Sequence, residues 1–258
     1  GSKDNTASIL DDYAKKDARI RVFHTPNAGA ASARNFALNK IEDEEWISFI
    51  DADDYIGPSM YESIFKAIGN EHIDYVRLFS RRTPQRYNPQ AVNSDESKNV
   101  NYKIVTREEY FVNESVGGYT HSLFVKKGIV DDHQVSFPEK MVMLEDQAFS
   151  IACATHAKKI LILDQPRNYF YYSGNESSIT RTSKDTSDDI IRCINIVYKA
   201  FLATGSTAII NDSLYSKRLH YRHIKLTERL LPEIKLRIGR LSFKTKIKYI
   251  IVKIFRLI

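Results

Sequence analysis

The sequence contains little cysteine. Its 258 residues include only Cys153 and Cys193, and each lies in an apolar stretch. Small secreted domains depend on paired cysteines, and structural zinc sites need four closely spaced Cys or His ligands. We therefore predict two buried thiols, no disulfide framework, no zinc cluster and a reducing compartment such as the cytoplasm.

The sequence also lacks a long uncharged apolar run, an internal repeat and a low-complexity segment. About 20 consecutive apolar residues are needed to cross a bilayer as a helix, so no transmembrane helix is predicted. A hydrophobic content of 43% nevertheless allows a sizeable core, and a charged content of 27% is ordinary for a folded domain. These proportions exclude disorder and favour one large domain or one domain with an appendage.

Acidic residues are absent after Glu233, although the chain as a whole carries a net charge of only +6. Basic residues alternate there with apolar ones, mostly at helical spacing, as in Leu236, Arg237 and Ile238. This pattern is typical of a basic amphipathic helix on an anionic membrane surface. A helix packed on the protein's own core is the alternative. A nucleic-acid partner is not expected, because no binding motif accompanies the charge.

Strand and helix patterns alternate along the chain, which predicts α/β layers. The predicted strands are residues 19–23, 46–50, 75–79, 122–125, 160–163 and 169–172. The predicted helices run through residues 9–13, 30–40, 58–68, a short segment from Thr106, 145–157, 185–203 and 213–231. Thr106 followed by Glu109 has the form of a capping box, and residues 81–101 are predicted to be a loop.

Three carboxylates directly follow the apolar run of residues 46–50, in the segment Asp51-Ala52-Asp53-Asp54. Ligands of open α/β sheets bind beyond the carboxyl ends of the strands. Crowded carboxylates repel one another unless a cation is bound, and Mg²⁺ or Mn²⁺ takes one or two carboxylates together with substrate phosphates. The segment predicts a divalent-cation site for a phosphate-bearing ligand, with an ordinary Asp-rich turn as the alternative.

Three segments in order resemble the donor-binding half of family 2 glycosyltransferases of the GT-A type: GSKDNT, RIRVFHTPNAGAASARNFAL and WISFIDADDYI. The likeness extends through Leu144-Glu145-Asp146 to about residue 182. It implies a Rossmann-like, mixed but mainly parallel sheet flanked by helices over residues 1–182. Residues 183–258 would then form a C-terminal helical region with the basic tail.

The resemblance begins at Gly1, at the glycine of the family's Asp-Asp-Gly-Ser. We therefore expect this chain to lack the family's first strand, the helix after it and the second strand. Those parts normally surround the nucleobase, so one sheet edge is expected to be unpaired.

The resemblance also implies roles for individual residues. Asp51 and Asp53 would hold Mn²⁺ or Mg²⁺ on the diphosphate of a nucleotide-sugar donor. The same likeness places donor-binding residues at Arg34, Asp51, Asp54, Asn27 and Gly29. His220 and His223 stand at helical spacing and could bind a metal, but no further ligands stand near them in the sequence. They are therefore interpreted as ordinary structural residues, as are His24, His121 and His133.

Glu145 and Asp146 resemble the family's Glu-Asp motif, in which the aspartate deprotonates the acceptor hydroxyl. Asp146 would be the catalytic base and Glu145 its neighbour, although acids in a first helical turn also occur simply because they interact favourably with the helix dipole. Inverting transfer needs one base and a cation that stabilises the leaving diphosphate. The Gln-x-x-Arg-Trp motif of processive members is absent, since Trp46 is the only Trp, which favours addition of single sugars.

Together these features predict an inverting, metal-dependent glycosyltransferase at the inner face of the cell membrane, using a UDP-sugar and a glycan or lipid-linked acceptor. Two alternatives remain. One is a non-catalytic, membrane-binding remnant of such an enzyme. The other is a metal-dependent nucleotidyl or phosphoryl transferase.

Overall fold

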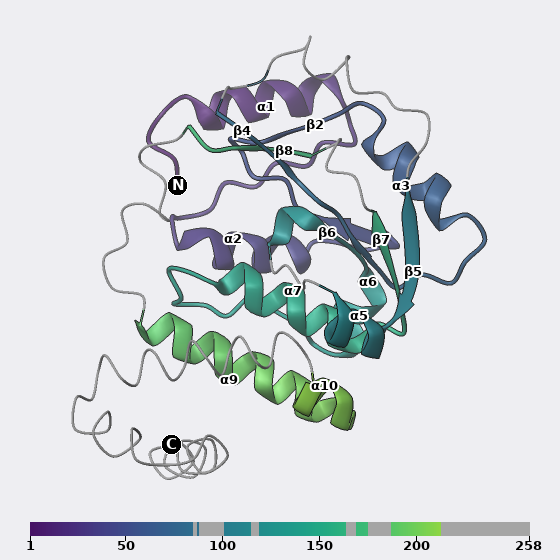
Figure 1. Ribbon diagram of the computed structural model, residues 1–258. Helices are drawn as coiled ribbons and strands as arrows, with labels where there is room; N and C mark the ends of the chain where they lie inside the picture. The colour runs from purple at the N-terminus through teal and green to yellow at the C-terminus, as the bar shows by residue number, and fades with distance from the viewer. Residues whose placement is uncertain (85–86, 88–100, 115–118, 164–168, 175–186, 213–258) are drawn as a thin grey trace.

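The computed structural model describes residues 1–84, 87, 101–114, 119–163, 169–174 and 187–212. These residues form a mixed α/β arrangement (Figure 1). A five-stranded sheet has the order β1-β6-β3-β7-β5. Its strands are β1 (Trp46–Ser48), β6 (Leu123–Lys126), β3 (Tyr75–Arg77), β7 (Lys159–Leu163) and β5 (Tyr102–Thr106). A smaller sheet has the order β2-β8-β4, formed by β2 (Tyr55–Ile56), β8 (Tyr169–Tyr172) and β4 (Arg81–Thr83).

The fold class is confirmed, but the prediction of a mainly parallel sheet is wrong for the described strands. In the larger sheet only β3 and β7 pair in parallel. The pairs β1–β6, β3–β6 and β5–β7 are antiparallel. The cause is the chain path: β6 enters between β1 and β3 in the opposite direction, and β5 adds an antiparallel edge beside β7.

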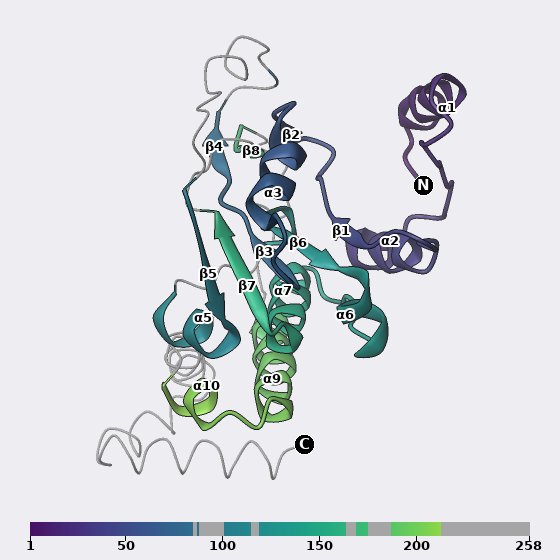
Figure 2. The ribbon, with the colours of Figure 1, turned by 90° about the vertical axis from the view of Figure 1, so that its right-hand side faces the viewer.

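Alternating side chains on these strands build two cores, one on each face of the sheet. Val76, Phe124 and Leu161 point to the face covered by α3 (Met60–Ile68). Tyr75 and Ile160 point to the other face. That face is covered by α5 (Arg107–Asn113), α6 (Lys127–Asp132), α7 (Glu145–His156) and α9 (Ser187–Ala203). Helix α9 lies along α7 in both views and buries Cys193 in their shared core (Figures 1 and 2).

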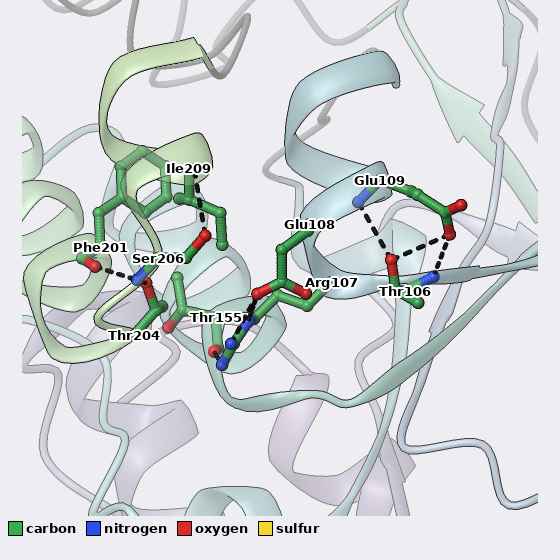
Figure 3. A network of polar contacts seen from close by, with 9 residues as sticks. All are labelled: Thr106, Arg107, Glu108, Glu109, Thr155, Phe201, Thr204, Ser206 and Ile209. Atoms are coloured by element: carbon green, nitrogen blue, oxygen red, sulfur yellow. Dashed lines mark hydrogen bonds and ion pairs between the residues drawn. The ribbon is translucent and has the colours of Figure 1, made fainter.

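The start of α5 confirms the predicted capping box. The Glu109 N–H donates to Thr106 Oγ1 at 3.2 Å, and Glu109 Oε2 accepts from the Thr106 N–H at 2.8 Å (Figure 3). These two bonds satisfy backbone donors that a helix start otherwise leaves without partners. Arg107 pairs with Glu108 and donates to the Thr155 carbonyl, which ties α5 to the last turn of α7.

Two predicted strands need correction. Residues 19–23 form no strand, because no neighbouring described segment supplies ladder hydrogen bonds; Arg19 instead pairs with Asp17. The strand predicted over residues 46–50 ends at Ser48, and only Ile47 in it is buried. Strand β1 is an edge strand among those described and pairs only with β6, so its apolar run is only partly buried.

Residues 81–101 were predicted to be a loop, yet β4 forms there against β8. Strands β2 and β5 were also not anticipated, nor were α6, the short 3-10 turn η1 (Thr120–Ser122) and α10 (Thr207–Asp212). The remaining predicted elements that fall on described residues are present within a few residues of their expected ends. They include α1 (Thr6–Lys16) and α2 (Gly29–Leu38).

Helix α1 buries no residue and stands apart from the sheet in Figure 2. Ile9, Leu10 and Tyr13 on it are exposed. None of the described helices combines the length and apolar composition that crossing a bilayer requires. The predicted helix over residues 213–231, the basic tail and residues 175–182, where the family resemblance ends, lie outside the described residues.

Candidate active site

Arg34 joins two of the predicted motifs directly. From α2, its Nη2 donates to Asp51 Oδ1 at 2.8 Å and its Nη1 donates to Glu145 Oε1 at 3.1 Å. The Arg34 side chain is 18% exposed and its guanidinium lies over the Phe137 ring, 5.4 Å from the centroid. One planar cation therefore neutralises part of the charge of two carboxylates that are 94 residues apart in sequence.

The neighbouring residue, Asn35, holds the loop beneath Arg34. Its Nδ2 donates to the Phe137 carbonyl at 2.9 Å, and its Oδ1 accepts from the Phe137 N–H at 2.8 Å. The Phe137 ring stacks on Phe149 of α7, with centroids 4.0 Å apart. These paired amide bonds and the ring stack fix α2 against α7, so the position of Arg34 is set by packing on both sides.

Asp54 lies in a second hydrogen-bonded group. Its two carboxylate oxygens accept from the Tyr169 hydroxyl at 2.7 Å and the Tyr172 N–H at 2.8 Å. The Tyr169 hydroxyl also accepts from the Asp51 N–H at 3.2 Å. Burial raises the pKa of Asp54 to about 6, although both hydrogen bonds oppose the shift. Tyr169 of β8 therefore fixes the backbone and the side chains of the acidic segment relative to each other.

Asp146 has the properties of a base that works near neutral pH. Burial, followed by the nearby charge of Glu145, raises the pKa of Asp146 from 3.8 to about 7. The Gln147 N–H, which donates to Asp146 Oδ1 at 2.7 Å, and the Arg34 charge both oppose this rise. A carboxylate with a pKa near the working pH takes up a proton more readily than an exposed one while remaining partly ionised.

The backbone just before Asp146 is strained and clamped. Leu144 has a left-handed conformation with φ of 68°, which a leucine rarely adopts. The buried Asp189 carboxylate of α9 accepts from the N–H groups of Val142 and Met143, at 2.8 and 3.0 Å. Helix α9 thereby holds the segment that leads into the Glu145-Asp146 pair.

Among the described residues, one group has the composition and spacing to hold a metal ion. It consists of Asp51, Asp54 and His121, whose candidate ligand atoms all lie within 4.8 Å of one another. His121 is 7% exposed, and burial lowers its pKa to about 4, so its imidazole is neutral near pH 7. Two carboxylates and a neutral imidazole are a donor set that a divalent cation accepts.

The other predicted site residues, Asp53, Asn27 and Gly29, are more exposed than the group described above. That group, which we call the centre, consists of Arg34, Asp51, Asp54, His121, Glu145 and Asp146. Asp53 is exposed and is not a member of the Asp51–Asp54–His121 group. Asn27 and Gly29 are exposed at the start of α2, where Asn27 Oδ1 accepts from the Gly29 N–H at 3.2 Å. No hydrogen bond within the described chain joins either of them to the carboxylates. Their roles toward a ligand remain predictions.

Sequence reasoning missed His121 of the centre, and it missed Tyr169, Asn35 and Asp189 as residues that support the centre. Asn35 was visible within the Ala-Arg-Asn segment beside Arg34. Tyr169 lies in the strand predicted over residues 169–172, but nothing in that strand's pattern indicates a contact with the acidic segment. Its hydroxyl contact with Asp54 depends on the pairing of β2 with β8, which periodicity does not predict.

A comparison with protein families finds that the model of glycosyl transferase family 2 matches residues 1–130, half of the chain. A curated relative, an uncharacterized glycosyltransferase EpsJ of Bacillus subtilis, is 28% identical over 190 residues, which cover 70% of this chain. The poly(ribitol-phosphate) beta-N-acetylglucosaminyltransferase TarS of Staphylococcus aureus is 23% identical over 229 residues, or 88% of the chain. The chain spans only 52% of the first relative and 38% of the second.

Solved structures support the same fold. The crystal structure of S. aureus TarS 1–349 in complex with UDP-GlcNAc superposes with a TM-score of 0.63 at 20% sequence identity. The superposition covers 94% of this chain and 65% of that structure. The likeness therefore concerns the fold of nearly the whole chain.

Proposed function

The chain belongs to glycosyl transferase family 2, and from this premise we propose that it transfers a sugar from a UDP-sugar to a hydroxyl group with inversion. The observation that carries the proposal is the link through Arg34, which brings the acidic segment after β1 together with the Glu145-Asp146 pair. In this proposal the acidic segment after β1 faces the donor diphosphate. Asp146, with a pKa of about 7, is the base that takes the acceptor proton.

In the proposed reaction, Asp146 takes the proton from the acceptor hydroxyl while that oxygen attacks the anomeric carbon. A new glycosidic C–O bond forms as the bond to the diphosphate breaks, and the nucleoside diphosphate leaves. Glu145 keeps the pKa of Asp146 high through its charge, and it also fixes Arg34. No covalent enzyme intermediate is needed, because one displacement inverts the configuration.

A divalent cation would be held beside Asp51, with the exposed Asp53 as the second proposed ligand, and would offset the charge of the leaving diphosphate. Mn²⁺ and Mg²⁺ are the ions to test. The presence of a cluster of Asp51, Asp54 and His121 supports a cation at this end of β1. Arg34, Asp54, Asn27 and Gly29 are the further donor-binding residues of the proposal.

The choice of donor and acceptor follows from relatives. TarS is named as a beta-N-acetylglucosaminyltransferase, and a structure of it contains UDP-GlcNAc. We therefore propose UDP-GlcNAc as the first donor to test, and a glycan or lipid-linked acceptor. The basic sequence after Glu233 supports action at the inner face of a membrane, as a peripheral protein.

The nucleotide released from the donor tests the function. With UDP-GlcNAc, Mn²⁺ and a panel of saccharide acceptors, we expect release of UDP, measured by chromatography and above that of an Asp146→Asn variant. Release of UMP or inorganic phosphate would assign the site to nucleotidyl or phosphoryl transfer instead. No release with any UDP-sugar would contradict the proposal and favour a non-catalytic remnant.

A further inference from the structure

His121 is held in a fixed orientation by a stack of tyrosine rings. Its centroid lies 5.0 Å from that of Tyr169, 5.4 Å from that of Tyr171 and 5.2 Å from that of Tyr119. The ring planes are within 24° of parallel in all three contacts. The side chain has little freedom to turn, so whatever its ring nitrogens face is determined by the fold.

Strand pairing explains why this imidazole meets the acidic segment. Strands β1 and β6 are antiparallel, with Ser48 opposite Phe124. Continuing this register three residues past the Ser48–Phe124 pair places His121 opposite Asp51. The aspartates leave the carboxyl end of β1, while His121 approaches the start of β6, so they meet at one edge of the same strand pair.

The three candidate ligands are oriented before any ion binds. One nitrogen of His121 and one carboxylate oxygen each of Asp51 and Asp54 lie within 4.8 Å of one another. Tyr169 supports all three at once: its ring stacks on His121, and its hydroxyl bonds Asp54 and the Asp51 N–H. Ligands already held in place lose little freedom when an ion binds, which strengthens binding.

One nitrogen of the imidazole, Nε2, has a hydrogen-bond partner, so Nδ1 is the nitrogen left to bind an ion. His121 Nε2 lies 3.1 Å from Ser80 Oγ, at hydrogen-bond distance. Histidines that bind metals almost always use their other nitrogen in such a bond, which sets the tautomer and leaves a lone pair for the ion. A buried histidine that served only as packing would also need this hydrogen bond, but it would not need the two nearby carboxylates.

We propose that His121 is a direct ligand of the divalent cation, together with Asp51 and Asp54, and in addition to Asp53, the exposed ligand of the proposed function. This inference deepens the proposed function, since the same ion would face the donor diphosphate. The ligand set then contains one nitrogen and at least two oxygens. Imidazole binds transition metals well, whereas Mg²⁺ and Ca²⁺ prefer oxygen ligands alone. The site should therefore select Co²⁺ and Mn²⁺ over Mg²⁺.

The test measures binding of the metals themselves to the whole chain, without nucleotide. Replacing His121 with glutamine should weaken Co²⁺ binding by at least about tenfold, the smallest loss expected even for an outer-shell partner of a metal. Mg²⁺ binding should stay within about threefold, because an amide oxygen suits that ion. With Mn²⁺ bound, electron spin-echo spectra should show coupling to an imidazole nitrogen in the unmodified chain and lose it in His121→Gln. His72→Gln, at an exposed histidine, is the matched control and should change neither property.

A second variant keeps the test valid if His121→Gln fails to fold. His121→Tyr retains a ring for the stack but removes the nitrogen ligand, so it should also lose Co²⁺ binding while its melting temperature stays close to that of the parent. Unchanged Co²⁺ affinity and Mg²⁺ selectivity in a folded variant would overturn the inference. If that same variant still binds UDP in a metal-dependent way, the proposed function stands although His121 is not a ligand. If the unmodified chain binds no UDP, the proposed function itself is contradicted.

Discussion

Replacing Asp146 with asparagine is expected to slow sugar transfer by about 10²–10⁴-fold, the usual contribution of a positioned general base. Asparagine has nearly the same shape but cannot accept the proton of the acceptor hydroxyl. Donor affinity should change little, because the prediction gives Asp146 no contact with the donor. Single-turnover transfer and calorimetric UDP binding measure the two quantities separately.

The pH dependence of the transfer rate of the unmodified chain is an independent test of Asp146 as the base. Since the pKa of Asp146 is about 7, the transfer rate should rise as the pH increases through 7 and then level off. The residual activity of Asp146→Asn should lack this rise. Asp132→Asn, at an exposed carboxyl of α6, is the control and should keep the full profile.

Measuring the stability of Asp146→Asn distinguishes a loss of catalysis from a loss of folding. The folded-state pKa of Asp146 is raised from 3.8 to about 7, so its contribution to folding is fully present below pH 3.8 and is lost as the pH rises to 7. Asp146→Asn removes a partly buried charge that is ionised at pH 8, so the variant should be at least as stable as the parent at that pH. A variant that keeps normal transfer would remove Asp146 from the role of base.

Replacing Arg34 with alanine is expected to weaken both donor binding beside Asp51 and the arrangement of the Glu145-Asp146 pair. Asp51 and Glu145 would lose their shared cation, and the unfolding free energy should fall by about 1–3 kcal/mol. That is less than for a wholly buried pair, because the Asp51 side chain is 34% exposed. UDP binding should weaken more than tenfold, roughly the loss expected when a buried charged partner is removed.

The same variant should shift the pH profile. The Arg34 charge lowers the pKa of Asp146, so its removal should move the midpoint of the transfer rate to higher pH. Arg34→Lys should not restore activity, since one ammonium group cannot reproduce the planar pair of bonds to Asp51 and Glu145. Arg107→Ala breaks a comparable half-buried ion pair far from the centre in sequence and should leave the profile unchanged (Figure 3). An unshifted midpoint in Arg34→Ala would contradict the electrostatic link.

Local patterns predicted much of the fold. The capping box at Thr106, the apolar run before Asp51 and the amphipathic α9 depend on nearby residues, and each has a periodic or positional signature. The predictions that failed concern strands whose hydrogen-bond partners lie far along the chain. The segment 19–23 has strand-like residues but no described neighbour to pair with, and β4 forms in a polar stretch because β8 supplies its hydrogen bonds.

The residues of the candidate site also fall into those that the sequence predicted and those that it did not. The family motifs indicated Arg34, Asp51, Glu145 and Asp146, and the structure brings these four side chains together. Two of its supporting residues, Tyr169 and Asp189, could not be predicted. Tyr169 reaches Asp54 over 115 residues and Asp189 reaches Met143 over 46, so both contacts exist only once the sheets and α9 have packed.

Calorimetric titration of UDP into this chain, with and without Mn²⁺, tests most directly whether it has a nucleotide-sugar site. Asp53→Ala is the variant to compare, because Asp53 is exposed and its replacement should not disturb the fold. We predict binding that requires Mn²⁺ in the parent and loses this requirement or disappears in the variant. Absence of UDP binding to the parent at any Mn²⁺ concentration, or unchanged Mn²⁺-dependent binding by Asp53→Ala, would contradict the donor site proposed for this strand end.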